Sequence, residues 1–362
     1  MTSPDICWDD AGFRESIQAT LDTFIDEQAR ILEPLGPDAG RLVEAAHRSV
    51  SGGKRFRAAF CYWGFRAVDD DRRDPDTDTS GILRAAASLE LLHASALVHD
   101  DYMDDSDTRR GRPATHKSFE AHHRDHGWRG DPDQYGAAAA ILLGDLLLSW
   151  SDEMLRTCGL DHGLVREALG FFDLTRSEVI AGQFLDVSTQ ARGESDVDIA
   201  MRVLRYKSAK YSIERPLHIG AALAGGRPDT LAALSRFGLP LGEAFQLRDD
   251  LLGVFGDPAV TGKPAGDDLA EGKRTVLVAL ALDQAPKERA ALLDARLGTE
   301  LSPQDVRELQ EVIEDSGAPS EVEKVIAELT DRSLTALERA PITATARGVL
   351  HTLAMAATQR VV

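Results

Sequence analysis

One stretch, from Leu89 to Arg112, constrains what this chain can fold into more than any other. It reads LELLHASALVHDDYMDDSDTRRGR, an apolar run that ends in a group of carboxylates followed by adjacent arginines. Asp100 and Asp104 are four residues apart, so on a helix they lie on one face, about one turn from each other. His93 lies on the same face, because seven residues make almost two turns.

Like charges at this spacing destabilise a bare helix, and a solvated acidic surface is the simplest interpretation. Here, however, the carboxylates directly follow the apolar run from Leu89 to Val98. Negative charge at the edge of an apolar interior is costly unless it is paired. A divalent cation would remove the repulsion, and oxygen ligands favour Mg²⁺ over Zn²⁺. We therefore expect a metal site at this helix end.

The remaining sequence is typical of an all-α protein. Ala and Leu predominate among the 43% of apolar residues, and runs of β-branched residues are scarce, which favours helices over strands. No βαβ alternation, GxGxxG fingerprint or internal repeat is present. Apolar spacing predicts helices over 13–32, 41–50, 80–103, 136–155, 164–189 with an interruption at Gly182, 203–224 with a kink at Pro216, and 231–255. Continuous helices with short breaks predict a single all-α domain over residues 1–362.

Residues 116–136 read as a polar connector. Its histidines have no recognisable zinc spacing, so we interpret them as solvated loop residues. They are His116, His122, His123 and His126.

The formal charge of −19 argues against nucleic acid or an anionic membrane as a partner. Any anionic substrate therefore needs a local cationic or metal site. Three widely spaced cysteines suit reduced thiols in a cytosol. The acidic start lacks the apolar core of a secretory signal, and no uncharged apolar run is long enough to cross a bilayer. We expect a cytoplasmic protein without a transmembrane segment.

Two further patterns point to anion chemistry. The glycine pair of GGKRFR (52–57) precedes three cations, and such a loop can offer backbone donors to an anion, although it could equally be an ordinary helix-breaking loop. A second acidic pair, Asp249 and Asp250, ends the apolar segment 231–255, and a glycine-rich loop with Lys263 and Lys273 follows it.

Paired carboxylates could act as acid and base in glycoside hydrolysis, but that reaction would not need these lysines and arginines. A substrate with several phosphate oxygens needs the carboxylates, the lysines and the arginines together. Carboxylates hold Mg²⁺, the metal bridges phosphate oxygens, and Arg and Lys bind the remainder. A diphosphate neutralised in this way becomes a leaving group. If the organic part is allylic, its departure gives a stabilised carbocation in an apolar pocket.

The sequence here resembles the trans-isoprenyl diphosphate synthases, the family that includes farnesyl and geranylgeranyl diphosphate synthases. The resemblance runs from about residue 52 to 275 in the family's order of motifs. These are GGKRFR (52–57), DDYMD (100–104) with RRG (109–111), GQFLD (182–186), Lys207–Ser208, FQLRDD (245–250) and GKPAGDD…GKRT (262–275). It implies an all-α isoprenoid synthase fold around a central substrate cavity, with residues 276–362 as further helices of the same domain.

The resemblance implies roles for individual residues. Magnesium, three ions per active site, would be held by Asp100, Asp104 and Asp249, with Asp101 in support. Contacts to the allylic diphosphate or its metals are implied for Arg109, Lys207, Ser208, Gln246, Lys263 and Lys273. The isopentenyl diphosphate site would comprise Gly53, Lys54, Arg57, His93 and Arg110. The residues implied in catalysis are Asp100, Asp101, Asp104, Arg109 and Lys207.

The implied reaction is ionisation of an allylic diphosphate, attack by the double bond of isopentenyl diphosphate, and proton loss. We assign no side chain to the last step, since the released diphosphate is the base favoured in this family. The resemblance also implies a homodimer. The second acidic motif departs from the pattern, because Gly253 stands where many members have a third aspartate, and Asp257 or Asp267 could compensate. Ser208 replaces the usual threonine and keeps the hydroxyl.

Two alternatives share some of these features. A class I terpene cyclase has a helical fold and a DDxxD motif, but should lack GGKRFR and the loop GKPAGDD…GKRT, both present here. A non-catalytic partner subunit of a synthase usually loses the aspartates, and the departure at Gly253 keeps this alternative open. A plain helical interaction protein would require every motif to be coincidence.

Product length should depend on the residues below the first acidic motif. Ala96 lies one turn, about 5.4 Å, before Asp100, and Ser95 is beside it. Short-chain members that resemble this chain carry a bulky aromatic residue here, so small residues leave a tail channel open and predict geranylgeranyl diphosphate. We expect Ala96→Phe to shorten the product, measured by chromatography. An unchanged product would contradict this assignment of the channel floor.

Overall fold

The computed structural model describes residues 10–68, 79–257 and 265–359. Nearly all of these residues are helical, which confirms the all-α prediction. They form two compact units. The first takes the residues up to Leu169 together with Ile219–Gly226, and the second takes Gly170–His218 and the residues from Arg227 onward. The single-domain assignment of residues 1–362 stays a prediction.

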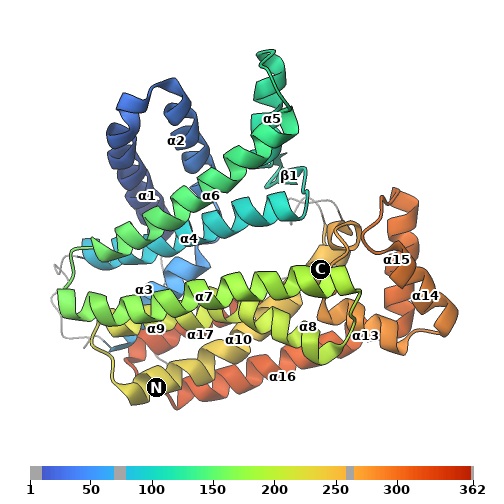
Figure 1. Cartoon of the computed structure of the whole chain (residues 1–362). Helices are drawn as coiled ribbons and strands as arrows, with labels where there is room; N and C mark the ends of the chain where they lie inside the picture. Colours follow the sequence, from blue (N-terminus) through green and yellow to red (C-terminus); the bar gives the residue numbers. More distant parts are fainter. Residues whose placement is uncertain (1–9, 69–78, 258–264, 360–362) are drawn as a thin grey trace. The chain divides into compact units, whose positions relative to one another are not determined.

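The first unit is built around α4 (Ser80–Met103), which packs against α1, α3 and α6 (Figure 1). The other elements of this unit are α1 (Asp10–Leu32), the 3₁₀ turn η1 (Glu33–Leu35), α2 (Pro37–Val50), α3 (Phe56–Val68), the hairpin strands β1 (Thr108–Arg109) and β2 (Arg112–Pro113), α5 (Thr115–Asp125) and α6 (Pro132–Arg156). The predicted bounds of the central helix are confirmed.

Helix α4 is apolar on nearly all sides, which is the pattern of a buried core helix. By length and composition it is also long enough to cross a membrane. However, 72% of its most apolar window is buried inside the protein. Its hydrophobicity is thus explained by packing and does not indicate a membrane span.

Two expectations for the first half of the chain were wrong. The polar connector contains a helix, α5, and its residues His116 and His123 are buried. His123 contacts the carbonyl of Arg129 at 3.1 Å, and His116 packs edge-on against Tyr102. Tertiary packing thus buries polar residues that lack a clear apolar periodicity. Helix α7 (His162–Arg192) runs through Gly182 without interruption.

The second unit packs a cluster of apolar side chains from its long and C-terminal helices, including Leu247, Leu277, Leu309 and Val322. Its elements are the later part of α7, α8 (Val197–Val203), the π-helical segment η2 (Leu204–Glu214), the start of α9 (Arg215–Leu223), α10 (Pro228–Phe255), α12 (Asp267–Ala270), α13 (Val276–Gln284), α14 (Lys287–Arg296), α15 (Pro303–Ser316), α16 (Ala318–Glu338) and α17 (Ala344–Thr358).

The segment η2 is wider than an α-helix, and glycines on its neighbours make room for it. A Cβ at Gly242 of α10 would lie 2.4 Å from the carbonyl oxygen of Ala209. A partly buried ion cluster also stabilises this segment. Glu178 of α7 accepts hydrogen bonds from Lys210 at 2.5 Å and from Arg215 at 2.8 and 2.9 Å. The chain therefore changes helical form, rather than simply kinking at Pro216.

We expect Gly242→Ala to lower the free energy of unfolding by about 1–3 kcal/mol, because the added methyl meets backbone rather than a movable side chain. Gly170→Ala in α7 is the matched control. A Cβ there meets nothing within 4 Å, so this helical position should tolerate or slightly favour alanine. Denaturant melts of both variants would measure the difference, and equal midpoints would contradict the packing argument.

Candidate active site

The loop before α3 has an unusual backbone. Gly52 and Gly53 have φ of 71° and 94°, and Arg55 adopts a left-handed φ of 54°. Lys54 is exposed, whereas Arg55 is only 5% exposed and forms an ion pair of 3.1 Å with Glu90 of α4. The structure thus ties the predicted substrate loop to the central helix through a residue to which the sequence had assigned no role.

The predicted metal ligands lie at the end of α4. Asp100 and Asp104 are half-buried, and the amide of Asp104 donates to the carbonyl of Asp100 at 2.8 Å, so the two are one turn apart as expected. Asp101 is 3% exposed and accepts a hydrogen bond of 2.7 Å from Arg109 Nε. Arg109 is therefore held by Asp101. Its contact to the allylic diphosphate stays a prediction.

The β1–β2 hairpin carries the second arginine of the pair. Arg110 and Gly111 both have positive φ, 53° and 72°, as the central residues of a type I′ turn require. Arg110 donates to the carbonyl of Ser51 at 2.8 Å, and a Cβ on Gly53 would lie 3.2 Å from its guanidinium. The hairpin thus reaches the glycine loop, so two predicted parts of the isopentenyl diphosphate site lie together.

His93 lies among arginines. Burial lowers its pKa well below the usual value, and the charges of Arg57, Arg110, Arg109 and Arg55 lower it further. The imidazole is therefore neutral at physiological pH, and the excess positive charge comes from arginine. Arginines around one imidazole, in a chain of net charge −19, give a local positive potential of the kind that an anion would favour.

The acidic end of α4 fits Mg²⁺ rather than a cage-forming metal. Among the described residues, no three His, Cys, Asp or Glu side chains gather as a metal cage would need. Magnesium is commonly held by one or two carboxylates, with waters and substrate phosphates completing its coordination. Asp100 and Asp104 supply such a pair of oxygen ligands.

The two residues of the predicted channel floor differ in environment. Ser95 is buried at 3% exposure, and Ala96 is partly accessible. Of the two, Ala96 is thus the more accessible position, while Ser95 is enclosed by neighbours.

In the second unit, α7 and η2 approach closely. A Cβ on Gly182 would lie 2.4 Å from the backbone nitrogen of Lys207, so glycine is required for this approach. The Lys207 ammonium forms an ion pair of 2.6 Å with the buried Asp186. Asp186 ends the motif GQFLD (182–186), to which no role was assigned from the sequence. In the structure it is the ion-pair partner of Lys207, a predicted catalytic residue.

The hydroxyl of Ser208 donates a hydrogen bond to the amide oxygen of Gln246. Gln246 in turn donates to Asp250 at 2.8 Å. The predicted diphosphate contacts on η2 and α10 are thus joined in one hydrogen-bonded chain, which fixes the orientation of the Gln246 amide.

Asp250 is buried and lies within the electrostatic influence of other carboxylates. Burial above all, and then the charges of Asp268, Asp249 and Asp186, raise its pKa to about 8, against the lowering effect of a hydrogen bond from Gln246. Negative charge here is costly, although these carboxylates do not gather closely enough, among the described residues, to form a ready metal cage. Asp249, the predicted ligand, is half-buried.

The space beside Gly253 is filled by another residue. A Cβ there would lie 2.0 Å from a carboxylate oxygen of Asp268. The structure thus adds Asp268 as a neighbour of this position, while compensation for the missing third aspartate by Asp257 or Asp267 stays a prediction. No pattern in the sequence distinguished Asp268 from its neighbour Asp267.

Lys273 lies near this carboxylate, 3.7 Å from Asp268, and also pairs with Glu271. Lys263, predicted to contact the allylic diphosphate, lies outside the described residues.

We expect Asp268→Ala to raise the Mg²⁺ concentration needed for half-maximal turnover of an allylic diphosphate by about 10- to 100-fold, the usual cost of losing a group that supports a metal site. Asp283→Ala is the matched control, since it removes an exposed carboxylate outside the motifs. Magnesium titrations of both variants would measure this. Equal shifts would contradict the assignment of Asp268.

Comparison with known proteins agrees with these motifs. A family model described as polyprenyl synthetase matches residues 40–315. A geranylgeranyl diphosphate synthase of Mycobacterium tuberculosis is 35% identical over 309 residues, 79% of this chain and 81% of that protein. The crystal structure of a geranylgeranyl pyrophosphate synthase from Corynebacterium glutamicum, complexed with isoprenyl diphosphate and magnesium, is 42% identical with a TM-score of 0.94, covering 97% of this chain and 99% of that one. The chain therefore belongs to the polyprenyl synthetase family.

Proposed function

We propose that this protein is a trans-prenyltransferase that condenses isopentenyl diphosphate head-to-tail with allylic diphosphates to give geranylgeranyl diphosphate. The observation that carries the proposal is the juxtaposition in the first unit of an arginine-surrounded His93 with the carboxylates that end α4. An anion site beside a pair of metal-type ligands suits a diphosphate substrate, and family membership agrees with it.

Isopentenyl diphosphate would bind at the glycine loop, His93 and the hairpin. Lys54, Arg57 and Arg110 would pair with its phosphate oxygens, and Gly53 lets the backbone approach closely. The neutral imidazole of His93 can donate one hydrogen bond without adding charge. This arrangement holds the second substrate by its diphosphate, so that its double bond remains free to react.

The allylic diphosphate would be bound by Arg109, Lys207, Ser208, Gln246, Lys263 and Lys273. Mg²⁺, three ions per active site, would be held by Asp100, Asp104 and Asp249, with Asp101 orienting Arg109 and Asp268 supporting the second acidic group. When bound, it would neutralise the diphosphate and make it a better leaving group. The pairing of Lys207 with Asp186 holds the ammonium in place before substrate arrives.

Product length is proposed from the small residue at Ala96. A methyl here would leave room below the acidic pair for a tail longer than farnesyl, and the partial accessibility of Ala96 supports this. Relatives named for geranylgeranyl products support this choice.

We also propose a cytoplasmic homodimer whose chain folds as one domain, residues 1–362. Each unit exposes large apolar side chains that a partner could cover. Leu142 of α6 is 59% exposed next to Ile141, and Phe184 of α7 is 73% exposed near Ile180. Exposed apolar clusters of this kind mark interaction surfaces.

The decisive experiment incubates the protein with isopentenyl diphosphate and dimethylallyl, geranyl or farnesyl diphosphate, with and without Mg²⁺. We expect magnesium-dependent elongation ending at geranylgeranyl diphosphate. No elongation from any primer would overturn the proposal in favour of a non-catalytic partner subunit. A cyclic hydrocarbon product would instead indicate a class I terpene cyclase.

We expect Arg57→Gln to raise the KM for isopentenyl diphosphate by about 10- to 100-fold, the cost of a charge-assisted contact to phosphate. Arg30→Gln, which removes an exposed arginine of α1, should leave it unchanged. Steady-state kinetics with each substrate varied would measure both. A KM for isopentenyl diphosphate that Arg57→Gln leaves unaltered would contradict the placement of this site.

A further inference from the structure

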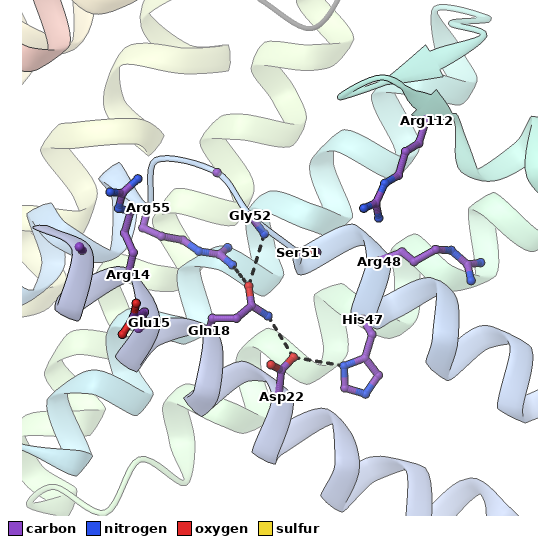
Figure 2. Close-up of a pocket in the computed structure, with 12 residues that line it drawn as sticks. Arg14, Glu15, Gln18, Asp22, His47, Arg48, Ser51, Gly52, Arg55 and Arg112 are labelled. Carbon is purple, nitrogen blue, oxygen red and sulfur yellow. Dashed lines mark hydrogen bonds and ion pairs between the residues drawn. The ribbon is translucent and has the colours of Figure 1, made fainter.

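The glycine loop is held from α1, a helix outside the motif-bearing region. The amide oxygen of Gln18 accepts a hydrogen bond from Arg55 Nη2 at 2.5 Å and a longer one from Gly52 N at 3.4 Å (Figure 2). The amide nitrogen of Gln18 donates to Asp22 at 3.0 Å, and Asp22 lies 3.3 Å from His47 of α2. This second contact orients the amide so that its oxygen faces the loop.

Packing does not hold the outer side of this loop. Gly52 is exposed, and a Cβ built on it would meet nothing within 4 Å. The loop borders an open pocket of about 730 Å³, also lined by Arg14, Arg48 and Arg112 (Figure 2). Two successive glycines with positive φ have wide conformational freedom. Directed polar contacts must therefore define the loop's position.

Arg55 is the residue through which these contacts act. A left-handed backbone is costly for a residue with a Cβ, and it persists where the surroundings fix it. The Arg55 guanidinium is fixed by Gln18, by Glu90 at 3.1 Å and by the carbonyl of Val50 at 2.5 Å. Glu90 also accepts from the amide of Ala58 at 3.2 Å, so the same carboxylate holds the start of α3.

These contacts surround the proposed second-substrate site. Lys54 precedes Arg55 and Arg57 follows it by two residues, while Glu90 lies three residues before His93 on α4. The orientation of the Arg55 guanidinium thus affects where the loop cations lie relative to the imidazole of His93. A diphosphate is recognised by cations in a fixed arrangement, so a shift of the loop would weaken binding without removing any cation.

We propose that Gln18, acting through Arg55, is a positioning residue for the isopentenyl diphosphate site. It sets the position of the glycine loop and with it the cations that hold this substrate. The inference rests on the proposed function and extends it to α1, where no motif lies. It assigns Gln18 no contact with the reacting atoms.

The test is Gln18→Leu in the full-length protein, which removes both hydrogen bonds to the loop at similar side-chain volume. We expect the KM for isopentenyl diphosphate to rise about three- to tenfold, the effect of a lost hydrogen bond, with the KM for the allylic primer within twofold. Thr20→Ala is the matched control, since the Thr20 hydroxyl donates to the carbonyl of Ser16 in its own helix. It should leave both KM values and the melting temperature unchanged.

The double variant Q18E/D22N keeps an acceptor at position 18 and reverses the polarity of its contact with position 22. We expect it to restore most of the affinity for isopentenyl diphosphate, which a merely structural role of Gln18 would not predict. Equal rises in KM for both substrates, an unchanged KM for isopentenyl diphosphate, or no rescue would each overturn the positioning role while elongation by the wild type upholds the proposed function. A wild-type protein that elongates no primer would overturn both.

Discussion

The buried ion pair between Arg55 and Glu90 is the contact on which the first unit's site depends. Breaking a buried pair leaves an uncompensated charge, which is strongly destabilising. This pair fixes the glycine loop against α4, and the hairpin then reaches the loop through Arg110 and Ser51. A site for a diphosphate must hold several cations close together before the anion arrives. Arg55, paired with Glu90, holds the loop that carries these cations in place although the cations repel one another.

The second unit holds negatively charged side chains near one another, as the first unit holds positively charged ones. Burial, together with the charges of Asp268, Asp249 and Asp186, raises the pKa of Asp250 to about 8. Lys207 pairs with Asp186, and the Ser208–Gln246–Asp250 chain orients another carboxylate. The wide η2 segment that carries Lys207 fits beside α7 because Gly182 has no side chain there. Each unit thus holds groups whose remaining charge suits a diphosphate or its magnesium ions.

Much of the fold and of the candidate site could be predicted from local patterns in the sequence. The bounds of α4 followed from apolar spacing, and the acidic pair at its end from the four-residue interval of Asp100 and Asp104. Prediction failed where tertiary packing overrode local preference. Residues 115–125 form a helix despite their polar composition, because His116 and His123 are buried by their neighbours. The π-helical form of η2 depends on glycines of other helices, which a reading of its own residues does not include.

The sequence by itself determined the family, the all-α class and the residues that carry charge to the site, because motif spacing and helical periodicity are local properties of the chain. The tertiary structure alone decided which neighbours complete the site. Asp268 fills the space beside Gly253, and Gln18 and Glu90 fix Arg55 from 37 and 35 residues away. Such partners are set by how helices pack, since a side chain's contacts across helices depend on distances that its own sequence neighbourhood does not encode.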